Sequence, residues 1–443
     1  MRTSISLSLH HAETASVLWI SLILAGILGL TLGTCLYMVR TQNVLVAESQ
    51  AWNATLALAE GGIEEGLAQI NIAAGNFSST SSATNFTPSA STNWGGSGAQ
   101  YGPVSRSLTN GTYSAIIDAS RAAPWIYATG YAEVPLLSRP IARVVQVQTA
   151  VSSGFGNAIS AQSGVTNKGN NITVDSYDSA DPAHSTNGMY CVTNRLAGGD
   201  VASTDGFIDV QNANIYGKLR TGPNGSYGIG ANGRVGPLDW AGPGIKPGWY
   251  ENDFNMDFPD VLEPYSPATG LMPTSTNSGG NTTWILGSGR YTMSSLNLQA
   301  GDTLLVTRSA TLYVTGNVDM KSQGNKASTI AIKGSATTFK LYVAGASANF
   351  TQVNTEGNAS SFQYFGLPSN NSLTWSGNAQ YMGQVYAPSA DFSLGGGGNN
   401  AMDFQGALVV RSITMNGHFN VHYDENLKRG PVVGFRVVSW REL

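Results

Sequence analysis

The stretch from Ala15 to Val39, ASVLWISLILAGILGLTLGTCLYMV, decides how the rest of the chain is interpreted. It contains no charged residue, and it exceeds the roughly 20 apolar residues that a helix needs to cross a bilayer. A cleaved secretory signal has an apolar core of only about 7–15 residues, so we favour a retained membrane helix over a cleaved signal. Residues 1–40 are therefore expected to form a cytoplasmic tail and a transmembrane helix.

The helical pattern continues beyond the apolar run. Apolar residues recur at helical spacing, at Leu45, Trp52, Leu56, Ala59, Ile63, Leu67 and Ile70. The spacing predicts one long helix from about Ala15 to Ile70. Gly61, Gly62 and Gly66 weaken this helix by roughly 1 kcal/mol each relative to Ala, and they allow another backbone to approach closely.

Residues 41–152 are expected to form a small domain around the second half of this helix. A loop rich in Ser, Thr and Asn spans 73–101. Three runs with the alternation of strands follow it, Thr112–Ala119, Trp125–Val134 and Ile141–Val151. Short polar turns separate them, which favours an antiparallel sheet. Such a sheet would cover the apolar stripe of the helix and form an α/β roll.

From residue 153 to residue 430 the chain alternates short β runs with Gly and Asn turns. Several units repeat loosely, roughly every 20 to 30 residues: LYVTGNVDM from Leu312, LYVAGASANF from Leu341, VYAPSADFSLGG from Val385 and LVVRSITMNG from Leu408. This pattern predicts a parallel β-solenoid. A β-sandwich remains the alternative, because closely spaced strands also suit that fold. Residues 431–443 are expected to be a C-terminal tail, and the fold class is mainly β.

Two family resemblances follow from these residues. The apolar run with Ala57-Leu58-Ala59-Glu60-Gly61-Gly62-Ile63-Glu64 resembles the N-terminal region of type IV pilin-like proteins of the PilX type. That resemblance implies a minor pilus or pilus-assembly component. Here Glu13 precedes the run and Ser6 to His11 contains no Gly, whereas pilins carry a Gly before the run.

The stretch from Gln384 to Leu427 resembles the end of an uncharacterised domain that often follows pilin-like N-termini in bacterial envelope proteins. It carries a "YAP" step, a Gly-rich turn and a final His422-Tyr423-Asp424. Asp175-Ser-Tyr-Asp-Ser179 also resembles that family, so the resemblance covers roughly Phe155 to Leu427. It implies no established activity. The pattern is also similar to polymer-forming bactofilin-like solenoids.

Three groups of side chains are candidates for metal binding. Asp253, Asp257 and Asp260 lie in the densest acidic stretch, and carboxylate oxygens suit Ca²⁺. Asp175, Asp178 and Asp181 form a similar set. His418, His422 and Asp424 fall together near the end, where alternate residues of a strand share a face. The competing interpretations are a solvated acidic loop with aromatic anchors for the first stretch, and hydrogen bonds that close the last turn for the third.

The composition separates the possible functions. A net charge of -4 provides no basic field, so we expect no nucleic-acid binding. Charged residues are 11% of the chain, fewer than a polysaccharide-degrading groove requires, so we expect no enzyme and no cofactor apart from possible Ca²⁺.

We expect a single-pass bacterial inner-membrane protein with its body in the periplasm or at the cell surface. It would act with pilus or envelope assembly proteins, as a structural component or adhesin. The alternative is a β-helix protein that binds a surface polysaccharide, through Trp240, Trp249, Tyr250 or Trp375, or that degrades one.

Overall fold

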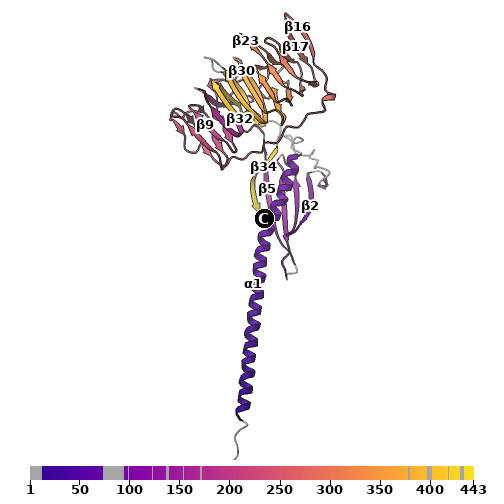
Figure 1. The fold of residues 1–443 in the computed structure, drawn as a ribbon, viewed down its shortest axis with the longest axis vertical. Coiled ribbons are helices and arrows are strands. Elements are labelled where there is room, and N and C mark those ends of the chain that lie inside the picture. The colour runs from indigo at the N-terminus through magenta and orange to yellow at the C-terminus, as the bar shows by residue number, and fades with distance from the viewer. Residues whose placement is uncertain are drawn as a thin grey trace, which may run out of the picture. The chain divides into compact units, whose positions relative to one another are not determined.

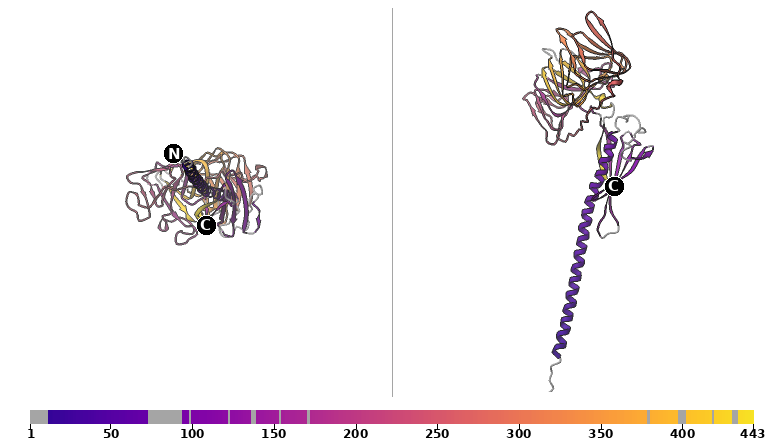
Figure 2. Two further views of the ribbon diagram at one scale, coloured as in Figure 1. Left: turned by 90° about the horizontal axis from the view of Figure 1, so that it is seen from below. Right: turned by 45° about the vertical axis from the view of Figure 1, so that its right-hand side comes forward.

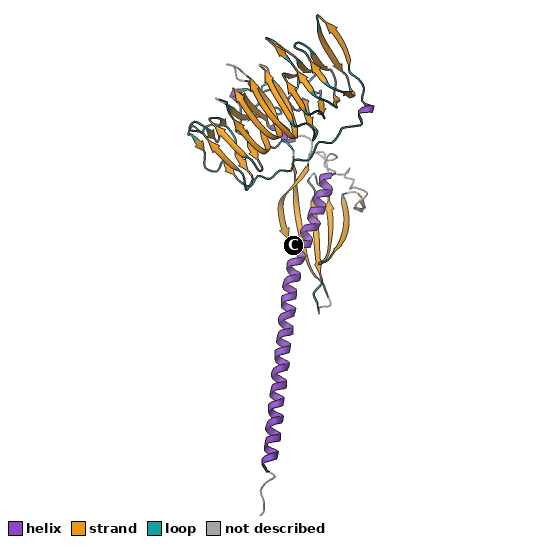
Figure 3. Ribbon diagram, viewed as in Figure 1, coloured by secondary structure: helices purple, strands orange, loops and turns teal. Residues whose placement is uncertain are grey.

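The computed structural model describes residues 12–72, 94–97, 99–121, 123–135, 139–152, 154–169, 172–377, 380–396, 402–417, 419–429 and 434–443. The described chain is mainly β, with one long apolar helix near its start (Figure 3). It divides into two compact units. Unit 1 comprises residues 1–151 and 432–443, and unit 2 comprises residues 152–431.

Helix α1 runs without a break from Ala12 to Ile72, which confirms the single long helix predicted from the sequence. Its most apolar window has a mean hydropathy of 2.1 and is 0% buried against the rest of the chain. By length and composition α1 can therefore cross a membrane. Figure 1 shows that the far end of the helix lies alongside strands.

The far end of α1 packs on a six-stranded sheet. In spatial order the strands are β1 (Gly96–Ser97), β2 (Gln100–Leu108), β3 (Gly111–Asp118), β4 (Trp125–Ala132), β5 (Ile141–Ser152) and β34 (Gly434–Glu442). Strands β2 to β5 pair antiparallel in chain order; β3, β4 and β5 are the three strands that the sequence predicts, whereas β2 was not predicted. From the predicted helical stripe, Ala59, Ile63 and Ile70 are buried against this sheet, whereas Leu45 and Trp52 remain exposed.

Two glycines of α1 sit where the helix comes closest to the sheet. A Cβ atom added at Gly62 would lie 2.9 Å from the Cβ of Ala128, and one added at Gly66 would lie 2.7 Å from Cγ2 of Ile126. Real Cβ atoms do not approach so closely, so these two positions require glycine. At Gly61 the nearest atom would be 3.8 Å away, which leaves ordinary space.

Two expected segments differ from the structure. Residues 431–443 were expected to be a tail, but Gly434–Glu442 forms β34 and adds to the free edge of β5. Phe435 is buried in the same apolar core as α1, and Arg143 binds Glu442 at 2.5 Å. An apolar and an ionic contact therefore hold this segment on the sheet. The expected loop 73–101 ends earlier, since β1 and β2 begin within it; residues 73–93 lie outside the described residues.

Unit 2 begins with ten short strands that run from the middle of the unit toward one end. They are β6 (Ile159–Asn167), β7 (Thr173–Tyr177), β8 (Val201–Ser203), β9 (Phe207–Gln211), β10 (Asn214–Ile215), β11 (Leu219–Thr221), β12 (Ser226–Ile229), β13 (Arg234–Val235), β14 (Gly244–Ile245) and β15 (Tyr250–Glu251). They pair in parallel: β6 with β8 and β9, β7 with β10, β8 with β11, and β11 with β15.

The second half of unit 2 starts at the opposite end and returns to the middle. Its strands are β16 (Thr274–Ser278), β17 (Asn281–Leu286), β18 (Gly289–Met293), β19 (Leu296–Leu298), β20 (Thr303–Val306), β21 (Ala310–Val314), β22 (Val318–Met320), β25 (Thr329–Ile332), β26 (Phe339–Val343), β27 (Ser347–Phe350), β28 (Gln352–Thr355), β29 (Phe362–Gly366), β30 (Ser372–Gly377), β31 (Tyr381–Gly396), β32 (Met402–Gly417) and β33 (Phe419–Asp424). A small hairpin, β23 (Ser322–Gln323) and β24 (Lys326–Ala327), branches off.

Apart from β16, which pairs antiparallel with β17, these returning strands form parallel rows. One row joins β18, β21, β26, β29 and β31, a second joins β17, β20, β25 and β28, and a third joins β19, β22, β27 and β30. The right-hand view of Figure 2 shows the strands of unit 2 stacked side by side. Strand β31 pairs with β32, and β32 then pairs with β6, the first strand of the unit. The last turn of the chain in unit 2 therefore lies directly against the first. We call the β32–β6 and β33–β7 boundary the seam.

One buried ladder of side chains crosses the seam without interruption. It consists of residues paired in register, Leu312, Leu341, Tyr364, Val385, Leu408, Ile159, Val201 and Leu219. All are 0–1% exposed. The sequence repeats beginning at Leu312, Leu341, Val385 and Leu408 therefore mark equivalent positions of four turns, with the turn at Tyr364 between the second and third.

An extended segment, residues 252–273, connects the two halves of unit 2. Its apolar side chains Met256, Phe258, Val261 and Tyr265 pack on an outward column of Tyr313, Tyr342, Phe365, Tyr386 and Val409. The hydroxyl of Tyr386 donates to the Pro259 carbonyl at 2.9 Å. The acidic stretch of the sequence is thus held to the side of the strands by its aromatic residues.

Candidate functional site

Two motifs from the sequence analysis meet at the seam. One, at 175–179, lies near the start of unit 2 in the sequence, and the other, at 422–424, lies near its end. Strand β33 pairs with β7 so that His422 lies opposite Asp175, Tyr423 opposite Ser176, and Asp424 opposite Tyr177. Residues separated by 247 positions in the chain are therefore neighbours. This pairing builds a cluster of polar side chains between the first and last turns.

His422 is held between two carboxylates. Its Nδ1 lies 2.5 Å from Oδ1 of Asp175, and its Nε2 lies 3.3 Å from Oδ1 of Asp403. The ring of Tyr190 stacks on the imidazole with centroids 3.5 Å apart, and its hydroxyl donates to Asp175 at 2.9 Å. Burial alone would lower the pKa of His422, but the hydrogen bonds and charges of the two carboxylates raise it. Both ring nitrogens contact carboxylates, so His422 links β33 to β7 across the seam.

A second group of carboxylates lies beside His422. Asp424 is fully buried and accepts the backbone N–H groups of Ser179 and Asn426 at 3.0 and 3.1 Å. Burial raises its pKa. Asp178 binds Arg429 at 2.8 Å, which ties the helical turn after β33 to the segment after β7. Oδ2 of Asp424 and the hydroxyl of Tyr177 are buried without a hydrogen-bond partner among the described residues.

The structure does not bring the other candidate metal ligands together. Asp253, Asp257 and Asp260 are exposed along the connecting segment 252–273. His418 lies outside the described residues. Among the residues that the structure describes, no group of three His, Cys, Asp or Glu side chains is placed to hold a metal ion. Metal binding therefore stays a prediction, and His422 and Asp424 make hydrogen bonds that join the last turn to the first.

A groove opens next to the seam. It has a volume of about 390 Å³ and is lined by Leu196, Ala197, Gly198, Asp200, Lys218, Arg220, Trp249, Glu425 and Lys428. Most of these residues come from β11 and from the segments that precede β8 and β15, and two come from the turn that follows β33. The parallel pairing of β8, β11 and β15 sets Asp200, Lys218 and Trp249 at the starts of adjacent strands.

The charges of the groove are arranged in pairs. Arg220 lies 3.1 Å from Asp200 and 3.0 Å from Glu251, and Lys218 also binds Glu251. Burial raises the pKa of Asp200 although the Lys218 backbone N–H and nearby cations oppose this. The hydrogen bond from Lys218 lowers the pKa of Glu251. Two neighbouring carboxylates thus differ in their tendency to ionise.

Sequence reasoning missed this groove. It relied on runs of charge along the chain, and Asp200, Lys218 and Arg220 lie outside any such run, whereas Glu251 adjoins the acidic stretch. The available signal was positional: Asp200 and Lys218 each directly precede a short strand that begins with an apolar residue, so pairing those strands brings the charges together.

The expected aromatic ligand platforms have different environments. Trp375 is fully buried in the core, against Tyr381, Phe404 and Phe419. Trp240 folds onto its own loop and donates to the Gly244 carbonyl at 3.3 Å. Tyr250 bonds Thr221 at 2.9 Å. Trp249 is the one of the four that lines the groove.

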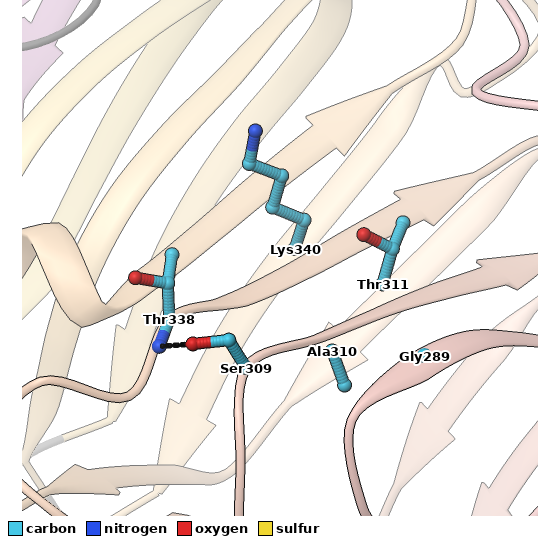
Figure 4. Close-up of a pocket in the computed structure, with 6 residues that line it drawn as sticks. All are labelled: Gly289, Ser309, Ala310, Thr311, Thr338 and Lys340. Carbon is cyan, nitrogen blue, oxygen red and sulfur yellow. Dashed lines mark hydrogen bonds between the residues drawn. The ribbon is translucent and has the colours of Figure 1, made fainter.

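A second, smaller hollow of about 150 Å³ lies on the row of β18, β21 and β26. Figure 4 shows its lining, Gly289, Ser309, Ala310, Thr311, Thr338 and Lys340, with the Thr338 backbone N–H donating to Ser309. The Lys340 amine points away from Ser309 in this view. Small hydroxyl side chains with one cation provide few convergent contacts, so the larger groove is the better candidate.

Comparisons with known proteins give limited guidance. A family model described as a domain of unknown function (DUF7305) matches residues 268–430, and no curated protein matches the chain. The competence-associated pilin ComZ from Thermus thermophilus is 10% identical, over 88% of this chain and 97% of that one, with a TM-score of 0.25. The DUF3494 domain of ice-binding protein_1 from Shewanella frigidimarina is 12% identical, over 62% of this chain and 98% of that one, with a TM-score of 0.22. Both scores are low, so function is argued from the residues themselves.

Proposed function

We propose that this protein is a membrane-anchored extracytoplasmic structural protein, in which a pilin-like unit carries a β-solenoid body. The observation that carries the proposal is the continuity of α1. Its apolar first part is exposed, with Leu24, Ile27 and Leu28 each more than half exposed, while Ala59 and Ile70 at its far end are fully buried under β3 and β4. A lipid bilayer is the medium that covers such a helix without a protein partner.

The solenoid interpretation rests on the pairing pattern. Strands separated by roughly 20 to 30 residues pair in parallel, and each row stacks apolar residues inward in register. A sandwich built from two antiparallel sheets lacks this pattern. A long helix over an antiparallel meander is likewise the arrangement expected of a pilin-like roll, so a role in pilus assembly or as an envelope scaffold or adhesin is the class we favour.

Cell fractionation with intact-mass measurement tests the anchor. We expect the full chain to stay in the membrane fraction after an alkaline wash, and external protease to digest unit 2 in spheroplasts. A variant lacking residues 12–39 should become soluble, whereas deleting the exposed β23–β24 hairpin should leave the chain in the membrane. Recovery of a soluble native protein whose mass lacks the apolar run would overturn the anchor. Recovery in sheared filaments would favour a pilus component over a tethered scaffold.

A further inference from the structure

The groove beside the seam has the dimensions and the rigidity of a binding site. Its volume of about 390 Å³ falls in the range of roughly 300–1,000 Å³ typical of small-molecule sites. Its floor is fixed by the seam: Ser176 donates to Glu425 at 2.8 Å and accepts the Gly198 N–H at 2.7 Å. A Cβ at Gly198 would lie 2.2 Å from Oε1 of Glu425, so a side chain there would displace the Glu425 carboxylate.

The charges in and around the groove are paired. Three lining cations, Lys218, Arg220 and Lys428, face two lining carboxylates, Asp200 and Glu425. Glu251 is not part of the lining, but it pairs with Lys218 and Arg220, so with it the formal charges cancel and the groove offers little net field to a charged ligand. Each pair instead presents hydrogen-bond donors and acceptors side by side. Adjacent hydroxyl groups on a ligand need this combination, because each hydroxyl both donates and accepts.

Trp249 supplies an apolar wall to the same groove. Its carbonyl accepts the Leu219 N–H at 3.0 Å, which holds this segment against β11. An indole ring next to paired charges suits a ligand with one apolar face and a polar rim. A pyranose ring has this character, since its C–H groups gather on its faces and its hydroxyls lie around its edge.

We propose that the groove binds a neutral saccharide, one or two sugar units long, with a ring against Trp249 and hydroxyls on the paired charges of Lys218, Arg220, Asp200 and Glu425. This inference goes beyond the anchoring function and is independent of it. A soluble form could bind sugar, and an anchored form could fail to, so the two tests have separate outcomes.

Saturation-transfer NMR on the full chain tests the proposal. The chain is solubilised in lauryldimethylamine oxide, which carries no sugar, and is titrated with tetrasaccharides of glucose, mannose, galactose and N-acetylglucosamine. We expect transfer to at least one of them in the millimolar range or tighter. Trp249→Ala should weaken that binding about tenfold or more, and Trp249→Phe should restore part of it.

The matched control is Trp125→Ala. Trp125, which lies under the guanidinium of Arg121, belongs to unit 1 and does not line the groove, so this variant should bind like the parent. Thermal unfolding followed by circular dichroism checks that each variant is folded. Absence of transfer from all four tetrasaccharides, or unchanged binding by a folded Trp249→Ala, overturns the proposal.

Discussion

In each unit a carboxylate cluster joins distant parts of the chain. In unit 1, Glu65 of α1 accepts hydrogen bonds of 2.7–3.2 Å from side chains on or near the sheet, those of Arg106, Tyr113 and Trp94. In unit 2, Asp175 of β7 is contacted by His422, Tyr190 and Arg195. In both clusters neighbouring side chains contact one carboxylate, and the two clusters differ in the solvent exposure of that carboxylate.

The side chain of Glu65 is 18% exposed, whereas that of Asp175 is 0% exposed. Glu65 also works beside an apolar contact that docks the helix, formed by Ala59, Ile63 and Ile70. At the seam, the polar cluster lies between two strands that meet from opposite ends of the unit. We therefore expect the loss of one partner to cost more at the buried Asp175 cluster than at Glu65, because an unpaired charge is more costly where water cannot reach it.

The largest expected effect is at Asp175. Asp175→Asn keeps the shape of the side chain and leaves the buried His422 with one carboxylate, so we expect a loss of about 3–5 kcal/mol in the unfolding free energy of unit 2. Glu65→Gln is the matched variant in unit 1, and its expected loss is about 1–3 kcal/mol. Hydrogen exchange of β7 and β33 amides, against those of β3 and β4, reports each unit separately. Equal losses would contradict the comparison.

A smaller effect is expected where α1 meets the sheet. Gly62→Ala places a methyl group 2.9 Å from Ala128, so the helix must shift, at a cost of about 1–3 kcal/mol. The adjacent Gly61→Ala meets nothing closer than 3.8 Å and should stabilise the helix by up to about 1 kcal/mol. Urea unfolding monitored by exchange in unit 1 measures both. If the two variants behave alike, helix propensity and not close packing controls the docking.

Much of this architecture could be predicted from local patterns. The helix, β3 to β5 and the in-register repeats at Leu312, Leu341, Val385 and Leu408 all follow from periodicity, which is a property of neighbouring residues. One turn was missed, the segment beginning at Tyr364, because its Tyr-Phe-Gly departs from the Leu-Tyr-Val pattern.

The seam and β34 could not be predicted in the same way. The seam depends on β32 and β33 returning to β6 and β7, and nothing local specifies that pairing. The two motifs containing Asp175 and His422 were both noticed, but only the fold reveals that they face each other. Strand β34 follows unit 2 in the sequence, so its place on β5 depends on an edge formed hundreds of residues earlier.

The His422 and Glu65 clusters should lose their stabilising effect at opposite ends of the pH range. The pKa of His422 is raised above its ordinary 6.5, so its stabilisation is complete below about 6.5 and is lost as pH rises through the folded-state pKa. The pKa of Glu65 is lowered below 4.5, because hydrogen bonds from Arg106, Tyr113 and Trp94 outweigh burial. Its stabilisation is complete above about 4.5 and is lost as pH falls through the folded-state pKa.

Each unit of difference between folded and unfolded pKa corresponds to about 1.4 kcal/mol. Hydrogen exchange across a pH series, corrected for intrinsic rates, should therefore show unit 2 weakening above neutral pH and unit 1 weakening in acid. His422→Gln should remove the first trend and leave the second. A parent protein whose unit 2 gains stability between pH 6 and 9 would refute the assignment of a charged His422 to the seam.

The smallest effect is expected at an exposed tie with similar geometry. Lys333 and Glu356 join successive turns of unit 2 at 2.7 Å, but their side chains are 57% and 52% exposed. Water and salt already screen this pair, so Glu356→Gln should leave the unfolding midpoint of unit 2 unchanged within error. A loss comparable to that of Asp175→Asn would mean that linking successive turns matters wherever it occurs. An unchanged midpoint would indicate that charged contacts between turns stabilise unit 2 at the buried seam, where its last turn pairs with its first, and not at the exposed surface.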